Sequence, residues 1–246
     1  MLGLPNQITA CLFDLDGVLT KTALIHADAW KQTFDAFLHE RAQHSSEAYV
    51  PFDKGTDYLA YVDGRQRTEG VSQFLASRGI TLPIGHEGDN DFATQQGLGQ
   101  LKTEVFDRLL SERGVTTYPS SVEYLKVLRQ RGIACAVVSA SKHARQVVAA
   151  GGLEDFFLAR VDGVTAAQQD LRGKPAPDMF LEAAALLAKQ PVECVVFEDA
   201  IACVQAGRAA EAGYVVGVDR NSQPDALRDA GADIVVSDLA ELLDQE

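Results

Sequence analysis

The 246-residue chain lacks several features that mark large classes of protein. It has 22 lysines and arginines against 35 aspartates and glutamates, so it has no basic excess from which to build a nucleic-acid groove. No apolar run approaches the roughly 20 residues that span a membrane, and no secretory signal pattern is present. We therefore expect a cytoplasmic protein that binds neither nucleic acid nor a membrane.

Cysteine is also scarce, and the four residues present have neither a C-x-x-C nor a Cys/His metal spacing. Three of them lie in apolar runs typical of strands, so we expect small, buried, apolar side chains. The chain has no G-x-x-x-x-G-K-[ST] segment, which argues against a P-loop ATPase. A small anionic substrate stays possible despite the formal charge of −13, because a metal and a few local cations can reverse an acidic field.

Short apolar runs alternate with helical stretches through the second half of the chain, which predicts an α/β fold. This alternation is typical of a Rossmann-like, doubly wound parallel sheet that has helices on both faces and binds ligands at the carboxyl ends of its strands. The predicted strands are Ile8–Phe13, Ala134–Val138, Phe157–Val161, Cys194–Phe197, Tyr214–Val218 and Ile234–Val236, and the predicted helices are Ser121–Arg131, Lys142–Ala150, Pro177–Lys189, Ala200–Ala212 and Pro224–Ala230.

Residues 21–115 have a different pattern, with helical spacing and no convincing strand. Leu24–Ala42 is long and amphipathic, Gly70–Arg78 and Phe92–Arg113 are shorter helical stretches, and Gly79–Gly99 is rich in Gly, Asp and Gln and predicts a loop. We expect residues 1–20 and 116–246 to form one α/β core domain, with residues 21–115 inserted as a helical domain.

The most informative motif is Phe13-Asp-Leu-Asp-Gly-Val-Leu-Thr20, which places Asp14 and Asp16 at the end of a predicted buried strand. Buried acids are costly unless a positive group meets them. Mg²⁺ suits them, because it prefers oxygen ligands and often binds through one or two carboxylates plus a phosphate. One aspartate can then attack phosphorus while the other moves protons. Alone, the motif also fits a metal site in a sugar transferase or two exposed turn acids.

Two later motifs carry groups that suit phosphate. Ser139, Ala140 and Ser141 follow a predicted strand and can present a hydroxyl and backbone N–H groups to phosphate oxygens, although a serine there often only caps a helix. Lys174 lies in Gly-Lys-Pro-Ala-Pro-Asp, just before a predicted helix. A lysine at this place can neutralise charge on a transferring phosphoryl group, or it can be a solvated loop residue.

A second pair of acids, Glu198 and Asp199, follows another apolar strand. With Asp14 they can complete an oxygen cage for Mg²⁺, or they can simply cap the next helix. Taken together, acids, hydroxyl, lysine and acids occur in a fixed order, and three of the four groups come directly after predicted strands.

This ordered set resembles the haloacid dehalogenase superfamily of phosphotransferases over nearly the whole chain and, within it, the β-phosphoglucomutase family. The resemblance implies a small sugar phosphate as substrate, Mg²⁺ as cofactor and a helical insert that acts as a cap domain. We expect a monomer. It implies conversion of β-glucose 1-phosphate to glucose 6-phosphate through the 1,6-bisphosphate. The open alternatives are a Mg²⁺-dependent sugar-phosphate phosphatase and a catalytically silent sugar-phosphate sensor.

The same resemblance implies roles for individual residues. Asp14 would become an aspartyl phosphate, and Asp16 would donate and remove protons. The metal ligands would be Asp14, the backbone carbonyl of Asp16 and Asp199, with Glu198 acting through bound water. The Ser139–Ser141 segment and Lys174 would bind the transferring phosphate.

In the insert, Thr22, His26 and Trp30 match positions that the family carries after the acid pair. Arg67, at the end of Gly64-Arg-Gln-Arg67, matches the arginine that grips the distal phosphate, and its planar fork suits that task. Arg108 is a further candidate cation.

Three features depart from the family pattern. Lys21 stands where small bacterial members have Asp, His143 stands where they have Asn, and the Gly79–Gly99 segment is longer than theirs. These departures leave the sugar and the contacts of the cap open.

Overall fold

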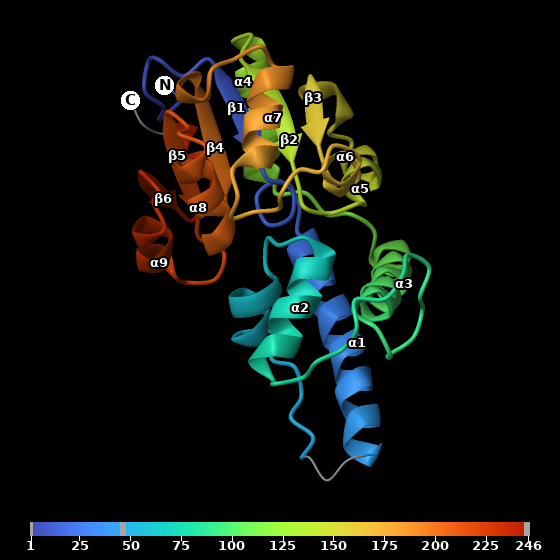
Figure 1. Cartoon of the computed structure of the whole chain (residues 1–246). Coiled ribbons are helices and arrows are strands. Elements are labelled where there is room, and N and C mark those ends of the chain that lie inside the picture. Colours follow the sequence, from blue (N-terminus) through green and yellow to red (C-terminus); the bar gives the residue numbers. More distant parts are fainter. Residues whose placement is uncertain (1, 45–47, 244–246) are drawn as a thin grey trace. The chain divides into compact units, whose positions relative to one another are not determined.

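The computed structural model describes residues 2–44 and 48–243, which form two compact units (Figure 1). The core unit comprises Met1–Lys21 and Val115–Glu246, and the helical unit comprises Thr22–Gly114. Residues 1 and 244–246, which the sequence places in the core domain, lie outside the described residues. Within the described ranges, no helix is both long and apolar enough to cross a membrane.

The core unit contains a six-stranded sheet in the order β3-β2-β1-β4-β5-β6. All five strand pairs are parallel. The chain adds β2 and β3 on one side of β1 and then β4, β5 and β6 on the other side. This confirms the predicted α/β fold. The strands are β1 (Ala10–Phe13), β2 (Ala134–Val138), β3 (Ala159–Val161), β4 (Cys194–Glu198), β5 (Tyr214–Val218) and β6 (Ile234–Val236), and the helices of the core unit are α4 (Pro119–Gln130), α5 (Ala144–Ala150), α6 (Gly163–Gln168), α7 (Asp178–Leu186), α8 (Ile201–Ala209), α9 (Pro224–Asp229) and α10 (Ala240–Leu243), with 3₁₀ turns η2 (Glu154–Phe156) and η3 (Pro191–Glu193).

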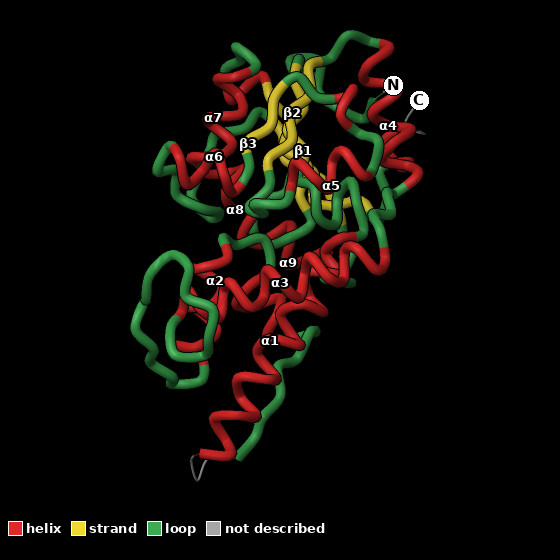
Figure 2. Tube along the Cα trace, turned by 90° about the vertical axis from the view of Figure 1, so that its right-hand side faces the viewer, coloured by secondary structure: helices red, strands yellow, loops and turns green. Residues whose placement is uncertain are grey.

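Helices cover both faces of the sheet because successive strand side chains point to opposite sides. Leu12 of β1 packs in a buried cluster with Phe180 of α7. The next residue, Phe13, stacks on Phe197 with ring centroids 4.3 Å apart and meets Tyr124 of α4 edge-on. Figure 2 shows α7 and α4 on opposite sides of the strands. The central strands β1 and β2 are almost wholly buried and continuously apolar, which is why they could be recognised in the sequence.

The helical unit has its own apolar core around Phe34, which is fully buried. The Phe34 ring lies 4.1 Å from that of Phe74, 5.0 Å from that of Trp30 and 5.3 Å from that of Phe52, measured between centroids. The elements of this unit are α1 (Thr22–His44), the π-helix η1 (Tyr58–Val62), α2 (Arg67–Ser77) and α3 (Gln95–Arg113).

Several predicted ends were wrong. The predicted loop Gly79–Gly99 is too long, because its last five residues belong to α3. The observed helix starts at Gln95, three residues after the predicted start at Phe92, because the Thr94 side chain accepts the N–H of Gly97 and caps the helix there. The first two residues of the predicted strand Ile8–Phe13 lie outside β1. The π-helix, α6 and α10 had no prediction, since a few residues carry too little periodicity to be recognised reliably.

We predict that Phe34→Ala lowers the free energy of unfolding of the helical unit by about 3–5 kcal/mol, because it removes the ring around which the other three aromatics pack. Urea denaturation followed by fluorescence checks this, since the chain's one tryptophan, Trp30, belongs to that unit. Leu24→Ala on the same helix is the control and changes stability by less than about 0.5 kcal/mol, because Leu24 is exposed. Equal effects of the two changes would contradict the prediction.

Candidate active site

Neighbouring parallel strands bring the two acid motifs together. Phe13 of β1 is in register with Phe197 of β4, and the N–H of Asp14 donates to the carbonyl of Phe197 at 3.0 Å. Ligand oxygens of Asp14, Glu198 and Asp199 all lie within 4.8 Å of one another, and all three residues are buried. The carboxylates meet at the carboxyl edge of the sheet because both strands end there.

Lys174 reaches this acid cluster from the loop before α7. Its side chain is fully buried, and its Nζ lies 2.7 Å from Asp14 Oδ1 and 2.5 Å from Glu198 Oε1. It also donates to the carbonyl of Val138 at 3.1 Å, and the Phe180 ring lies below it. Burial alone would lower the pKa of Lys174, but the attraction of the carboxylates outweighs it and holds the pKa well above its usual value. Lys174 is therefore a permanent ammonium in the site.

The charges of the cluster fit a divalent cation. The ammonium of Lys174 contacts two of the three carboxylates, which leaves two negative charges uncompensated among these four groups. Burial raises the pKa of Asp14, Lys174 partly offsets this, and the charge of Asp16 raises it further. A hard divalent ion bound to these oxygens would supply the missing positive charge. The side chain of Asp16 is not part of this set of three.

Asp16 lies instead beside the serine loop that follows β2. Ser139 Oγ donates to Asp16 Oδ2 at 3.2 Å and accepts the N–H of Ser141 at 3.2 Å. Gly163 packs closely against this loop, because a Cβ atom at Gly163 would lie only 2.6 Å from the carbonyl oxygen of Ala140. The structure therefore brings Ser139, the carboxylate of Asp16 and the neighbouring backbone amides to one place.

Gly17 closes the turn between the two aspartates and the rest of the chain. Its φ of +105° is a conformation that other residues rarely adopt, and a Cβ there would lie 1.9 Å from Asp199 Oδ2. Its N–H donates to the carbonyl of Thr20 at 2.8 Å. The sequence marks a turn here through Asp-Gly, but only the structure shows that the missing side chain makes room for Asp199.

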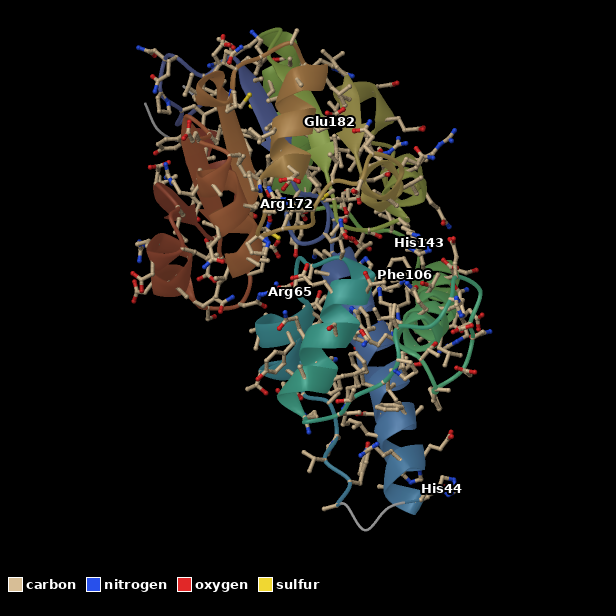
Figure 3. The ribbon with its side chains drawn as sticks, viewed as in Figure 1. His44, Arg65, Phe106, His143, Arg172 and Glu182 are labelled. Carbon is tan, nitrogen blue, oxygen red and sulfur yellow. The ribbon has the colours of Figure 1, made fainter. Side chains whose placement is uncertain are left out.

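Arg172 was also missed by sequence reasoning. Arg172, labelled in Figure 3, precedes Lys174 by two residues. It donates to Asp178, the first residue of α7, through Nε at 3.0 Å and Nη2 at 2.7 Å. This pair closes a short loop whose middle carries Lys174. Arg172 is largely exposed, so a signal for this role would have had to come from the six-residue spacing to Asp178.

The predicted residues of the insert lie in the helical unit. Thr22 is buried at the start of α1, and His26 follows one turn later. The Nδ1 atom of His26 lies 2.7 Å from Nζ of Lys102, a residue that sequence reasoning missed. The His26 ring stacks on that of Phe106 of α3, which Figure 3 labels. Lys102 is buried over the rings of Phe106 and Trp30.

Arg67 begins α2 and is anchored at one end. Its Nη1 donates to Thr103 Oγ1 at 2.6 Å, whereas its buried Nε has no hydrogen-bond partner among the described residues. Gly99 lies beside it, and a Cβ there would come within 3.1 Å of that Nε. Arg108 is exposed and bound to Gln32 and Glu112, so nothing in its contacts singles it out.

The residues that depart from the family pattern have local contacts. The N–H of His143, before α5, donates to Ser141 Oγ at 3.1 Å, and Figure 3 labels its side chain. Lys21 Nζ lies 5.4 Å from the centre of the Tyr118 ring. The Gly79–Gly99 segment is tied by Asp89, whose carboxylate accepts from Thr94 and from the N–H of His86.

If the three carboxylates hold a divalent cation, we predict that Gly17→Ala weakens its binding, probed with Mg²⁺, about 10–100-fold, because the new methyl group displaces the carboxylate of Asp199. Isothermal titration calorimetry on the purified protein measures this. The control is Gly132→Ala, which has a similar positive φ of +70° but no atom within 4 Å of the added Cβ. Equal Mg²⁺ affinity in the two variants would show that the turn does not constrain Asp199.

Comparison with known proteins agrees with the arrangement of these motifs. A model of the haloacid dehalogenase-like hydrolase family matches residues 8–211. A β-phosphoglucomutase of Mycobacterium tuberculosis is 49% identical and aligns over 99% of this chain and 94% of that protein. One of Bacillus subtilis is 33% identical over 96% of this chain and 94% of that protein. The solved structure of β-phosphoglucomutase from Clostridium difficile is 26% identical, with a TM-score of 0.74 over 96% of this chain and 93% of that one. The chain therefore belongs to the haloacid dehalogenase-like hydrolase family, as the order of its motifs predicted.

Proposed function

We propose that this protein is a β-phosphoglucomutase, which interconverts β-D-glucose 1-phosphate and glucose 6-phosphate through β-D-glucose 1,6-bisphosphate. The observation that carries the proposal is the buried ammonium of Lys174 between Asp14 and Glu198, at the strand edge where the acids of two motifs meet. The 49% identity to a β-phosphoglucomutase over almost the whole chain supports the substrate. The proposal is for a monomeric enzyme of the cytoplasm.

In this proposal, a carboxylate oxygen of Asp14 attacks phosphorus, and the bond from phosphorus to the sugar oxygen breaks. Asp16 donates a proton to that leaving oxygen and later removes one from the hydroxyl that attacks the aspartyl phosphate. Ser139, already in contact with Asp16, and the backbone amides after it bind the phosphoryl oxygens. Lys174 lies within reach of any phosphoryl group on Asp14 and neutralises its charge.

The residues present suit Mg²⁺, and the proposed ligands are Asp14, Asp199 and the backbone carbonyl of Asp16, with Glu198 acting through water. When bound, the ion would allow an anionic nucleophile to approach an anionic phosphate. The support is the set of three buried carboxylates, two of which contact the ammonium of Lys174.

The helical unit is proposed as a cap domain that binds the far end of the substrate. Arg67 donates through Nη1 to Thr103, and its buried Nε has no partner among the described residues, which suits an arginine that binds an anion. Thr22 and His26 are proposed as further substrate contacts, with Lys102 setting the position of the His26 ring. A mutase needs such a cap because its aspartyl phosphate must be kept from water while the bisphosphate turns over.

A sugar-phosphate phosphatase is the alternative, and the match to a hydrolase family model favours keeping it. It would use the same Asp14, Asp16 and Mg²⁺, but water would take the phosphoryl group. A silent sensor is a weaker candidate, since the acids, the lysine and the serine are all in place.

We predict that the protein with Mg²⁺, β-glucose 1-phosphate and a trace of the 1,6-bisphosphate forms glucose 6-phosphate well ahead of free phosphate. Both products are measured in the same sample by coupled assays. Asp14→Asn abolishes both, because an amide does not attack phosphorus. Release of free phosphate with little glucose 6-phosphate would contradict the mutase and support the phosphatase. Saturable binding of the sugar phosphate without turnover would support the sensor.

We also predict that Arg67→Ala lowers kcat/KM about 10–100-fold, the effect of losing one strong charge-assisted contact to the distal phosphate. Steady-state kinetics on β-glucose 1-phosphate measure it. Arg65→Ala is the matched control in the same motif, because Arg65 Nη1 is held by Glu69 at 2.6 Å, and it changes kcat/KM less than about twofold. An unchanged kcat/KM in Arg67→Ala would contradict the proposed contact between Arg67 and the distal phosphate.

A further inference from the structure

Arg220 has no part in the chemistry described above, yet its guanidinium joins three separate segments of the core unit. It follows β5, and its Nε donates to the carbonyl of Gly17 at 2.8 Å. Its Nη1 donates to the carbonyl of Ser237, also at 2.8 Å, and lies 3.9 Å from Asp238. Its Cζ lies 3.7 Å from the centre of the Tyr118 ring, which is close enough for the planar group to stack.

These contacts distinguish Arg220 from an ordinary surface arginine. Its side chain is only 15% exposed, and its buried Nη2 has no hydrogen-bond partner among the described residues. A buried donor left unsatisfied is unfavourable, so the other contacts of the guanidinium must outweigh it. Arg228 on α9 shows the usual case, because it is 56% exposed and its ion pair is with Asp225, three residues before it on the same helix.

The contact to Gly17 falls at a sensitive place. Gly17 lies between Asp16 and the rest of the turn, and its Cα packs against the carboxylate of Asp199 with no room for a methyl group. Glycine has more backbone freedom than any other residue, so a hydrogen bond to its carbonyl adds to the restraint that the turn's own backbone hydrogen bonds supply. The hydrogen bond from Arg220 fixes the direction of the Gly17 carbonyl and so restrains the segment that carries Asp16.

The contact to Tyr118 reaches the same segment from its other end. The N–H of Tyr118 donates to the carbonyl of Leu19 at 3.0 Å, and the N–H of Lys21 donates to the carbonyl of Thr116 at 2.8 Å. Here the chain that leaves the core unit pairs with the chain that re-enters it. One guanidinium therefore touches both the turn after Asp16 and the strand-like pairing that follows it.

We propose that Arg220 is a positioning residue that holds the segment 16–21 in place, and with it the carboxylate of Asp16 beside Ser139. The contacts above support this restraint directly, whereas its effect on kinetics rests on the proposed function, in which Asp16 is the proton donor. Arg220 acts through Gly17 and Tyr118 and does not touch the reacting atoms.

The test compares Arg220→Met and Arg220→Lys with Arg228→Met as the matched control. Hydrogen exchange followed by mass spectrometry measures peptides that cover residues 14–21 and 115–121, with peptides from β2 and β4 as internal references. We expect exchange at least about tenfold faster in the first two peptides of Arg220→Met, with the reference peptides unchanged, because only the restraint on that segment is lost. Arg220→Lys gives an intermediate effect, since an ammonium can bind one carbonyl but cannot stack and fork.

Kinetics on β-glucose 1-phosphate complete the test. We expect kcat to fall about 10–100-fold in Arg220→Met while KM changes less than about twofold, because a misplaced proton donor slows chemistry more than binding. Partial recovery in Arg220→Lys and unchanged kinetics in Arg228→Met are expected with it.

Unchanged exchange in the 14–21 peptide would overturn the proposal, and so would equally faster exchange in every peptide, which would mean that Arg220 only stabilises the fold. A fall in kcat matched by a rise in KM would overturn the kinetic part. If the wild-type protein showed no turnover on any sugar phosphate, the proposed function would fail, and the exchange experiment would still decide whether Arg220 holds the segment.

Discussion

The site depends on one buried ammonium among carboxylates. Lys174 has no exposed surface, and its Nζ contacts Asp14, Glu198 and the end of β2 at once. Removing one partner from such a group leaves an uncompensated buried charge, which is far more costly than losing a surface ion pair. The loop before α7, the acids after β1 and β4, and the serine loop after β2 therefore hold one another in place. Because the acids still outnumber the lysine, the same arrangement that organises the site also favours a divalent cation, and its binding would stabilise the fold.

Parallel strands make this gathering of charges possible. Residues 14, 139, 174 and 198 are separated in the chain, but residues 14 and 139 directly follow β1 and β2 and residue 198 ends β4, and these three strands lie side by side at the middle of the sheet. The apolar interior of the strands excludes water from the base of the site, and the strand ends present carboxylates, a hydroxyl and backbone amides where the apolar layer stops. The fold thus separates the part of the molecule that supplies stability from the edge that carries charge.

Much of the fold and part of the site could be predicted because their signals are local. The strands were recognisable as apolar runs, and Asp14, Glu198 and Asp199 were recognisable because they directly follow such runs. Contacts over long sequence distances carried no such signal. Nothing near Arg220 indicates Gly17, 203 residues away, and nothing near Lys102 indicates His26, 76 residues away. Helix ends were missed where a single side chain decides them, as Thr94 does for α3.

The close approach of Gly17 to Asp199 has a consequence for how this protein can vary. A larger residue at position 17 would need a smaller one at position 199, but aspartate already has the shortest side chain that offers a carboxylate. No second substitution can therefore relieve the first while a carboxylate is kept at position 199. We therefore expect substitutions to be rare at positions 17 and 199 among related sequences, even where the exposed residues of nearby helices vary freely.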